Sequence, residues 1–495
     1  MTRPKKSSAW LSGLALAAIL LAGCLPTVDA AGSRSRPRTR TIRSIETTTT
    51  TAPVAATTTT VAPPAPTTTT TTAPAPPAPS SGFVHPGVLV GQADLDLVRS
   101  KIAAGQQPWK GAYDKLLAGG SSEATADRPT RYRYSSLGYV PYPVPVVQYA
   151  SDSHLAYSDA NGLGWKNIAE AEHPDDAQAA YAHALLWAYT GNQAHADKAI
   201  QIMNAWSSTL REIKFDQPRH PVSGQPVYNG GKMQAAWAGS LFARAAEIIR
   251  YTGAGWSAGD IARMESMLHD VYLPITITNW SNGANWMTTL AEATISIGVF
   301  TNDRAAFDSG VAMWRYKVPT TIYLPTDGPT PLPPHTSYNT AAKIKSLWYN
   351  PSSYVSGLHA EALRDISHMA MGLGAMSNAA ETARLQGIDL FGEQEARIVA
   401  GYERGAGYVN EYLDKVASLG GAQPPSDWKP TGWVGSSFKV GGAFYTGGWE
   451  VAYSHYAVGE GISMPNTKRL VERLRPIGPS LHLSWQTLTS ARTAS

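Results

Sequence analysis

Two side chains four residues apart, Arg364 and His368, carry the first chemical signal in this sequence. On an α-helix such residues share a face, so both side chains can point into one cleft. A histidine titrates near neutral pH, so His368 can act as a base or as a partner for a carboxylate. A guanidinium is a suitable hydrogen-bond donor to a carboxylate. The pair therefore favours a site that handles both an acidic ligand and a proton.

Asn285 and Tyr453 lie far from this turn in the sequence but have matching chemistry. An asparagine amide can also donate to a carboxylate, and the phenol of Tyr453 is a candidate acid. A free phenol, with a pKa near 10, is a poor base at neutral pH unless a cation such as Arg364 lowers that pKa. The sequence leaves open whether His368 or Tyr453 is the base.

Each of the four residues also has a purely structural explanation. Arg364 could form a surface pair with Asp365, and His368 could be a satisfied core histidine. Asn285 could cap a helix, because it begins an apolar run. Tyr453 could simply pack against a neighbouring tyrosine.

The elements that must position these residues are mostly helices. Apolar residues recur at three- and four-residue spacing over 93–117, 175–190, 194–210, 232–251, 257–272, 285–300, 303–316, 358–386 with a break, 393–418 and a short stretch after Pro465. Most of these segments are joined by brief turns, and runs with strand periodicity are few. A long series of antiparallel helix hairpins predicts an all-α fold, an α/α toroid or incomplete helical barrel with few short strands.

Cys24 is the only cysteine in the 495 residues, and it follows a basic start and an apolar stretch over 10–22. This stretch is too short to span a bilayer but suits a signal peptide. The run Leu21-Ala22-Gly23-Cys24 resembles the bacterial lipoprotein signal, in which the cysteine is lipidated. We expect residues 1–23 to be removed and the protein to be a cell-envelope lipoprotein anchored in the membrane at Cys24, or secreted if the lipid signal is not used.

Residues 24–82 are predicted to be a disordered linker, because blocks of threonine alternate there with Ala-Pro pairs. Residues 1–82 hold 8 of the 41 basic and 2 of the 37 acidic residues, which leaves 33 and 35 for the rest. Proteins that bind nucleic acid carry a basic face, and nothing in this near-neutral balance suggests one, so we expect no nucleic-acid partner. We expect a globular domain over 83–480 and a tail over 481–495, and the oligomeric state is left open.

Short motifs follow one another in order along the globular part. They include His85-Pro-Gly, Ala182-His-Ala-Leu-Leu-Trp187, Ala245-Ala-Glu247, Asn282-Gly-Ala-Asn285-Trp286, Glu361-Ala-Leu-Arg364-Asp365-Ile-Ser-His368, Ala380-Glu381 and Trp449-Glu450-Val-Ala-Tyr453-Ser-His455-Tyr456. Together they resemble the alginate-lyase-like domain of bacterial polysaccharide lyases. The resemblance implies an α/α toroid that cleaves uronic-acid polysaccharides by β-elimination, with no metal or other cofactor in the chemical step.

The resemblance also implies roles for single residues. A uronate C5 proton is poorly acidic while the adjacent carboxylate is charged, so donors must first neutralise that charge before a base and an acid act. Asn285 and Arg364 would be the donors, and His368 and Tyr453 would be the base and the acid. The substrate-binding residues expected from the same motifs are Asn282, Trp286, Trp449, His455 and Tyr456.

The chain departs from the best-known alginate lyases at two places. Those enzymes carry His after the neutralising Asn, whereas Trp286 follows Asn285 here. Their Arg and Tyr lie about two helical turns apart, whereas the seventh residue after Arg364 is Met371. The anionic substrate could therefore be alginate, glucuronan or another glucuronate polymer. A Pro-rich, aromatic stretch over 323–354 is predicted to be a long loop above the cleft.

Two other classes of function stay open. The sequence has no His-Glu-x-x-His zinc helix and no glycine-rich phosphate loop, which argues against a metalloprotease or nucleotide-binding protein. A glycoside hydrolase would need two carboxylates, from a set that includes Glu292, Asp303, Glu361, Asp365 and Glu450. A surface-tethered glycan-binding protein would have lost catalysis altogether.

Overall fold

The computed structural model describes residues 82–125, 128–149, 168–214, 231–278 and 284–492. The predictions on the signal segment, Cys24, the linker up to residue 81 and Asn282 lie outside these residues. Among the helices that the structure describes, none is long and apolar enough to cross a membrane.

Helices make up most of the described chain. The first half holds α1 (Gln92–Ala103), α2 (Trp109–Ala118), α3 (Glu172–Thr190), α4 (Gln193–Thr209), α5 (Gly231–Tyr251), α6 (Ala258–Met267), α7 (Leu273–Thr276) and α8 (Asn285–Phe300). The second half holds α9 (Arg304–Lys317), α10 (Ala341–Leu347), α11 (Ile366–Leu385), α12 (Leu390–Glu393), α13 (Glu395–Ser418), α14 (Glu450–Ala452), α15 (Pro465–Leu474) and α16 (Gln486–Ser490).

The strands are short and form two separate pairs. β1 (Gly87–Val88) pairs antiparallel with β2 (Val90–Gly91), and β3 (Val146–Gln148) pairs parallel with β4 (Glu212–Lys214). Wider π-helical turns continue two of the helices, over Leu268–Tyr272 and Tyr453–Gly459. The predicted all-α fold of the α/α toroid class, with few short strands, is confirmed.

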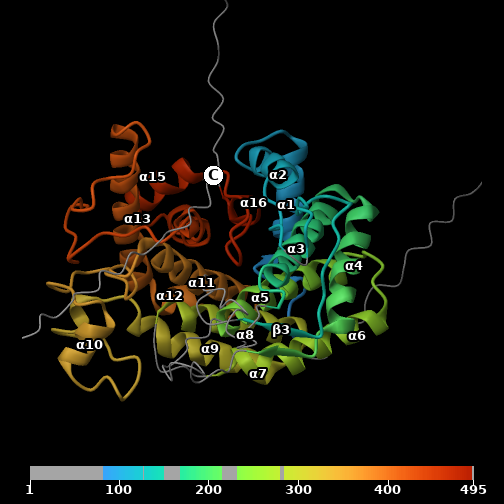
Figure 1. Ribbon diagram of the computed structural model, residues 1–495, viewed down its shortest axis with the longest axis horizontal. Helices are drawn as coiled ribbons and strands as arrows, with labels where there is room; N and C mark the ends of the chain where they lie inside the picture. The colour runs from blue at the N-terminus through green and yellow to red at the C-terminus, as the bar shows by residue number, and fades with distance from the viewer. Residues whose placement is uncertain (1–81, 126–127, 150–167, 215–230, 279–283, 493–495) are drawn as a thin grey trace, which may run out of the picture. The chain divides into compact units, whose positions relative to one another are not determined.

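Four long helices, α3, α5, α8 and α11, form an inner layer in which each packs against the next (Figure 1). Every residue of α8 is buried, and so are nearly all residues of α3 and α11. Helices α4, α9 and α13 pack on this layer and bury only one face each. A helix that is apolar on all sides is buried in a core, whereas an amphipathic helix packs on that core with its apolar face. The sequence pattern therefore explains why α3, α8 and α11 form the inner layer and α4, α9 and α13 the outer one.

A buried polar network ties the inner layer together. Arg244 on α5 forms an ion pair with Glu292 on α8 and donates a 2.6 Å hydrogen bond to the carbonyl of His482. Asn378 on α11 donates to Glu292 at 3.1 Å. Removing one partner of such a buried pair leaves an uncompensated charge, so the network fixes the three helices relative to the C-terminal segment.

The structure differs from the predicted helices in two places. The segment over 93–117 is two helices, because Gly105 adopts a left-handed conformation (φ 67°) and Pro108 lacks the N–H that a continuous helix would need. The segment over 358–386 becomes helical only at Ile366, where the side chain of Asp365 caps the helix.

The C-terminal segment belongs to the domain rather than to a tail. Leu483 and Trp485 are fully buried, and α16 packs against α1, α2 and α14. The domain therefore extends beyond the predicted boundary at residue 480, to at least residue 492.

Candidate active site

The N-terminus of α11 holds a histidine that is oriented by a carboxylate. Asp365 accepts a hydrogen bond from the backbone N–H of His368 at 2.9 Å, and its two oxygens lie 2.8 and 2.7 Å from Nδ1 of the same residue. Because a carboxylate only accepts, Nδ1 carries the proton and Nε2 keeps its lone pair. The His368 side chain is 26% exposed, so a ligand can reach it. The arrangement suits a general base.

Arg364 lies in the turn before this helix rather than on it. Its Nη1 is 3.6 Å from a carboxylate oxygen of Glu361, and its Nε is 3.9 Å from Asp365. The prediction that Arg364 and His368 share one face of a helix is therefore wrong, because only His368 is on α11. They are neighbours because both contact Asp365, and the Arg364 side chain is 35% exposed.

Asn285 begins α8 and is fully buried. Among the described residues, neither its amide nitrogen nor its amide oxygen has a hydrogen-bond partner. The residue at the cap position is Ala284, so Asn285 does not cap the helix with its side chain. A buried amide without partners costs free energy, which a bound ligand can recover.

His359 lies beside Asn285, although the sequence analysis did not select it. A Cβ placed on Gly372 of α11 would lie 2.8 Å from Nε2 of His359 and 3.2 Å from Cα of Asn285. His368 and Gly372 are four residues apart on α11 and share a face. At this glycine, the ring of His359 and the backbone of Asn285 approach α11 closely, on the helix face that also bears His368.

His359 is set up as a neutral hydrogen-bond donor. Its Nδ1 accepts from the backbone N–H of Glu361 at 3.1 Å, which places the ring proton on Nε2. Within the described residues Nε2 has no partner. Full burial lowers the pKa of His359 to about 3, so the ring stays uncharged at neutral pH.

Tyr349 is the tyrosine that the structure brings to this turn. Its hydroxyl donates to Glu361 at 3.3 Å, and Arg364 is a further polar neighbour. Burial, and then the charge of Glu361, raise the pKa of Tyr349 to about 12, so the phenol keeps its proton. Tyr349 lies within the aromatic stretch over 323–354 that was predicted to be a loop, but no motif marked this residue.

Tyr453 lies in a different setting. It is 9% exposed, on the π-helical turn after α14, and the guanidinium of Arg475 is 5.9 Å from its ring centre. Burial raises the pKa of Tyr453, and the positive charge of Arg475 opposes this shift. In the described part of the chain, no interaction of Tyr453 involves a partner of His368, so the structure does not join this tyrosine to the other predicted residues.

Three of the residues predicted to bind substrate are core residues. Trp449 and Tyr456 are fully buried and donate to the carbonyls of Tyr445 and Phe391 at 2.8 and 2.9 Å. Neither offers a surface to a sugar ring. Trp286 is 8% exposed and packs with a small apolar cluster next to Asn285, made of Met233, Trp237, Met371 and Leu483.

His455, also predicted to bind substrate, is half-buried in another part of the domain. Its ring stacks on Phe391 at 3.9 Å, and its Nε2 is 3.1 Å from a carboxylate oxygen of Glu460. It lines a cavity near the C-terminal end of α11, whereas Asp365 and His368 lie at the N-terminal end.

Three of the five carboxylates that a glycoside hydrolase could use are engaged elsewhere, and the other two, Glu361 and Asp365, hold Tyr349 and His368. Glu292 is paired with Arg244, Glu450 is paired with Arg475, and Asp303 caps α9. Hydrolysis of a glycosidic bond needs two available carboxyl groups on either side of it. Across the described ranges, no group of three His, Cys, Asp or Glu side chains could hold a metal ion.

Comparison with protein families identifies the domain. Residues 168–413 match the alginate lyase family. The domain is alginate-lyase-like, and the protein is a polysaccharide lyase, as predicted. The matched segment runs from α3 to α13 and contains Asn285, Tyr349, His359 and His368. Comparison with curated proteins gives no match.

Solved structures of alginate lyases are similar to this lyase in fold. A variant of alginate lyase A1-III complexed with tetrasaccharide is 15% identical with a TM-score of 0.49, and the match covers 84% of this chain and all of that one. Alginate lyase A1-III from Sphingomonas species A1 is 14% identical with a TM-score of 0.46, covering 78% and 94%. An alginate lyase from Bacteroides ovatus is 13% identical with a TM-score of 0.47, covering 83% and 100%.

Proposed function

We propose that this lyase cleaves a uronic-acid polysaccharide at the N-terminal face of α11. One observation carries the proposal: the buried side chains of Asn285 and His359 lack partners beside the helix face that bears His368. Polar groups left unpaired in a core are costly and mark places where a ligand completes the hydrogen bonds.

Asn285 and His359 would bind the substrate carboxylate. The Asn285 amide N–H and the neutral His359 Nε2–H can each donate to one oxygen, and Arg364 can approach from the open side. Hydrogen bonds from fixed donors spread the charge that develops when the C5 proton leaves. In this chain the imidazole donor would come from His359, since Trp286 follows Asn285.

His368 would remove the C5 proton. Its Nε2 takes the proton, the C–H electron pair forms the C4–C5 double bond, and the C4–O bond breaks. Asp365 stabilises the imidazolium that results, because it already holds Nδ1–H.

Tyr349 would protonate the leaving C4 oxygen. Its raised pKa keeps the phenol protonated until a strongly basic alkoxide develops in front of it. Glu361 accepts the hydrogen bond of this phenol and can return a proton to it through the same contact. Tyr453 stands as the alternative acid that the sequence motif suggests.

We propose a glucuronate polymer as the preferred substrate, with alginate as the second choice. The support is Trp286, which stands where the best-known alginate lyases carry histidine. The full-length protein should be assayed on alginate, glucuronan, hyaluronan, heparosan and pectate, with near-ultraviolet absorbance reporting the new C4–C5 double bond. The account predicts this absorbance on a glucuronate polymer, and its loss in His368→Ala.

The same assay separates the other two classes of function. New reducing ends without ultraviolet absorbance would identify a hydrolase. Binding of a polymer without either product would identify a glycan-binding protein.

We also propose that Cys24 is lipidated and holds the lyase at the cell envelope. The support is the Leu21-Ala22-Gly23-Cys24 run after the apolar segment over 10–22. The Thr/Pro-rich linker would then keep the domain clear of the membrane.

A further inference from the structure

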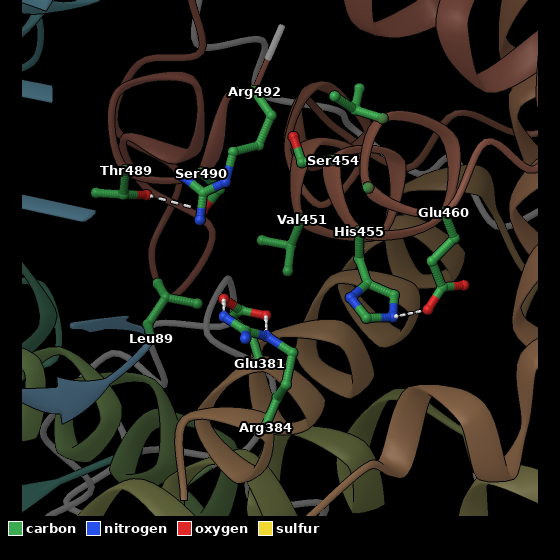
Figure 2. A pocket seen from close by; sticks show the side chains of 12 residues that line it. Leu89, Glu381, Arg384, Val451, Ser454, His455, Glu460, Thr489, Ser490 and Arg492 are labelled. Carbon is green, nitrogen blue, oxygen red and sulfur yellow. Dashed lines mark hydrogen bonds and ion pairs between the residues drawn. The ribbon is translucent and has the colours of Figure 1, made fainter. Parts of the chain in front are cut away.

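A cavity lies near the C-terminal end of α11. Its volume is about 430 Å³, within the range of small-ligand sites. Figure 2 shows its walls: Leu89 from the β1–β2 turn, Glu381 and Arg384 from α11, Ser454 from the turn after α14, and Arg492 from the C-terminal segment.

This cavity is separate from the candidate active site. Arg384 is sixteen residues beyond His368 on the same helix. At about 1.5 Å per residue this places the two side chains roughly 24 Å apart along the helix axis. The sugar being cleaved at His368 therefore cannot occupy the cavity at the same time.

Most charges in the cavity are already paired. Arg384 makes two parallel hydrogen bonds of 2.8 Å to Glu381, and His455 Nε2 lies 3.1 Å from Glu460 (Figure 2). A ligand with several negative charges would meet the carboxylates of Glu381 and Glu460. The carboxylates of these two ion pairs would repel a ligand that carries several negative charges, so the cavity disfavours polyanions.

Two polar groups in the cavity wall remain unpaired among the described residues. Arg492 uses Nη2 to bind Asp94 at 2.5 Å, while its Nη1 is buried and has no partner. The hydroxyl of Ser454 is also buried without a partner, and the residue is only 6% exposed. A guanidinium nitrogen offers only donors, so the missing partner is an acceptor, and one carboxylate would satisfy it.

The rest of the wall suits a sugar ring. Leu89, Val451 and Val458 form apolar surface, and the hydroxyls of Thr489 and Ser490 bond to each other at 3.2 Å. A pyranose has an apolar face and a rim of hydroxyls, so it can contact both kinds of surface.

We propose that this cavity is a second saccharide site, which binds one acidic monosaccharide unit through Arg492 and Ser454. Its carboxylate accepts from Arg492 Nη1 and from the Ser454 hydroxyl, and its ring lies against the three aliphatic side chains. The inference rests on the cavity itself and does not require the lyase reaction at His368.

Calorimetric titration of the full-length protein tests the proposal. The probes are glucuronate, glucose, acetate and inorganic phosphate, which separate an acidic sugar from a neutral sugar, a bare carboxylate and another oxyanion. We expect glucuronate to bind at least tenfold more tightly than the other three.

Variants then locate the binding. Ser454→Ala removes one unpaired hydroxyl and should weaken glucuronate binding at least fivefold without lowering the melting temperature. Arg492→Gln should weaken it at least tenfold. Arg304→Gln, which removes an exposed arginine paired with Asp308, is the matched control and should leave the affinity unchanged.

The titrations can also overturn the proposal. Absence of glucuronate binding, or phosphate binding as tightly as glucuronate, would reject an acidic-sugar site. Weakening by Asn285→Ala, with no effect of Ser454→Ala and Arg492→Gln, would place the binding at the active site instead. Lyase activity is measured separately, so a failed polymer assay with intact Arg492-dependent binding would reject only the proposed reaction.

Discussion

At the scale of single residues, the site depends on polar groups that the fold leaves unpaired. Asn285 and His359 are fully buried, and leaving such a group without a partner costs about 1–3 kcal/mol. A ligand carboxylate that accepts hydrogen bonds from these two groups would remove the cost. His368 is arranged differently, because its partner Asp365 is already in place before substrate binds.

Asp365→Asn tests the orientation of the base. The amide can still accept from the backbone N–H of His368, so the helix cap is kept, but it can no longer hold Nδ1–H as a carboxylate does. We expect kcat to fall by about 10²–10⁴-fold, the range that general base catalysis contributes, while the melting temperature changes little. A kcat within threefold of the wild type would contradict the role given to Asp365.

His359→Gln tests whether the imidazole is buried in its neutral form. The folded-state pKa is about 3, below the ordinary value of 6.5, so only the unfolded chain binds this proton between those values. The stability that this group contributes is present above pH 6.5 and is lost as the pH falls below it.

Between pH 6.5 and 5.5 the wild type should therefore lose about 1 kcal/mol more than the variant, because the unfolded histidine goes from half to almost fully protonated over this range. Urea unfolding at the two pH values measures this difference. Equal losses for both proteins would show that His359 titrates normally in the folded state.

At the scale of elements, the helices that carry the site were predictable and the turn before α11 was not. The apolar pattern predicted a helix over 285–300, which is α8. Over 358–365 the apolar residues have helical spacing too, but they are buried by a non-helical turn that Asp365 ends. The spacing of apolar residues along the sequence does not distinguish a buried helix from a buried turn of the same composition.

The contact partners far apart in sequence could not be predicted either. Tyr349 reaches Glu361 only because the segment after α10 folds back onto this turn. His359 has no motif around it and is defined by its neighbours Asn285 and Gly372. The motif around Trp449 and Tyr456, in contrast, suggested a sugar platform, but its aromatic rings fill the core.

Gly372→Ala tests the close approach on α11. An added Cβ would meet Nε2 of His359 at 2.8 Å and Cα of Asn285 at 3.2 Å. We expect about 1–3 kcal/mol of destabilisation from overpacking and a clear loss of activity.

Gly407→Ala on α13 is the matched control for that substitution. Its Cβ would have ordinary contact with Asn466 at 3.7 Å, so the better helix propensity of alanine should stabilise the protein by up to about 1 kcal/mol. Thermal unfolding and kcat of both variants check the pair. Equal effects of the two substitutions would mean that Gly372 has no special role.

At the scale of the whole molecule, the inner helices and the C-terminal segment act as one unit. The Arg244–Glu292 pair and the carbonyl of His482 join α5, α8 and residues beyond the predicted end of the domain. The α11 helix then bears the candidate active site at its N-terminal end and the cavity of the proposed saccharide site at its C-terminal end.

Cys24→Ser tests how the whole molecule is held in the cell. If Cys24 is lipidated, the serine variant should move from the membrane fraction to the soluble fraction or accumulate unprocessed. The activity of the purified domain should not change, because the substitution lies outside it. Unchanged membrane fractionation would reject the anchor.

The central claim is that elimination takes place at the turn before α11, with Tyr349 as the acid. Its most direct test is the turnover of the best polymer by Tyr349→Phe and Tyr453→Phe, followed by near-ultraviolet absorbance. Each variant loses one hydroxyl, so the pair is matched in chemistry. We expect Tyr349→Phe to lose at least about 10²-fold in kcat with little change in KM, and Tyr453→Phe to stay within threefold of the wild type. An inactive Tyr453→Phe beside an active Tyr349→Phe would contradict it.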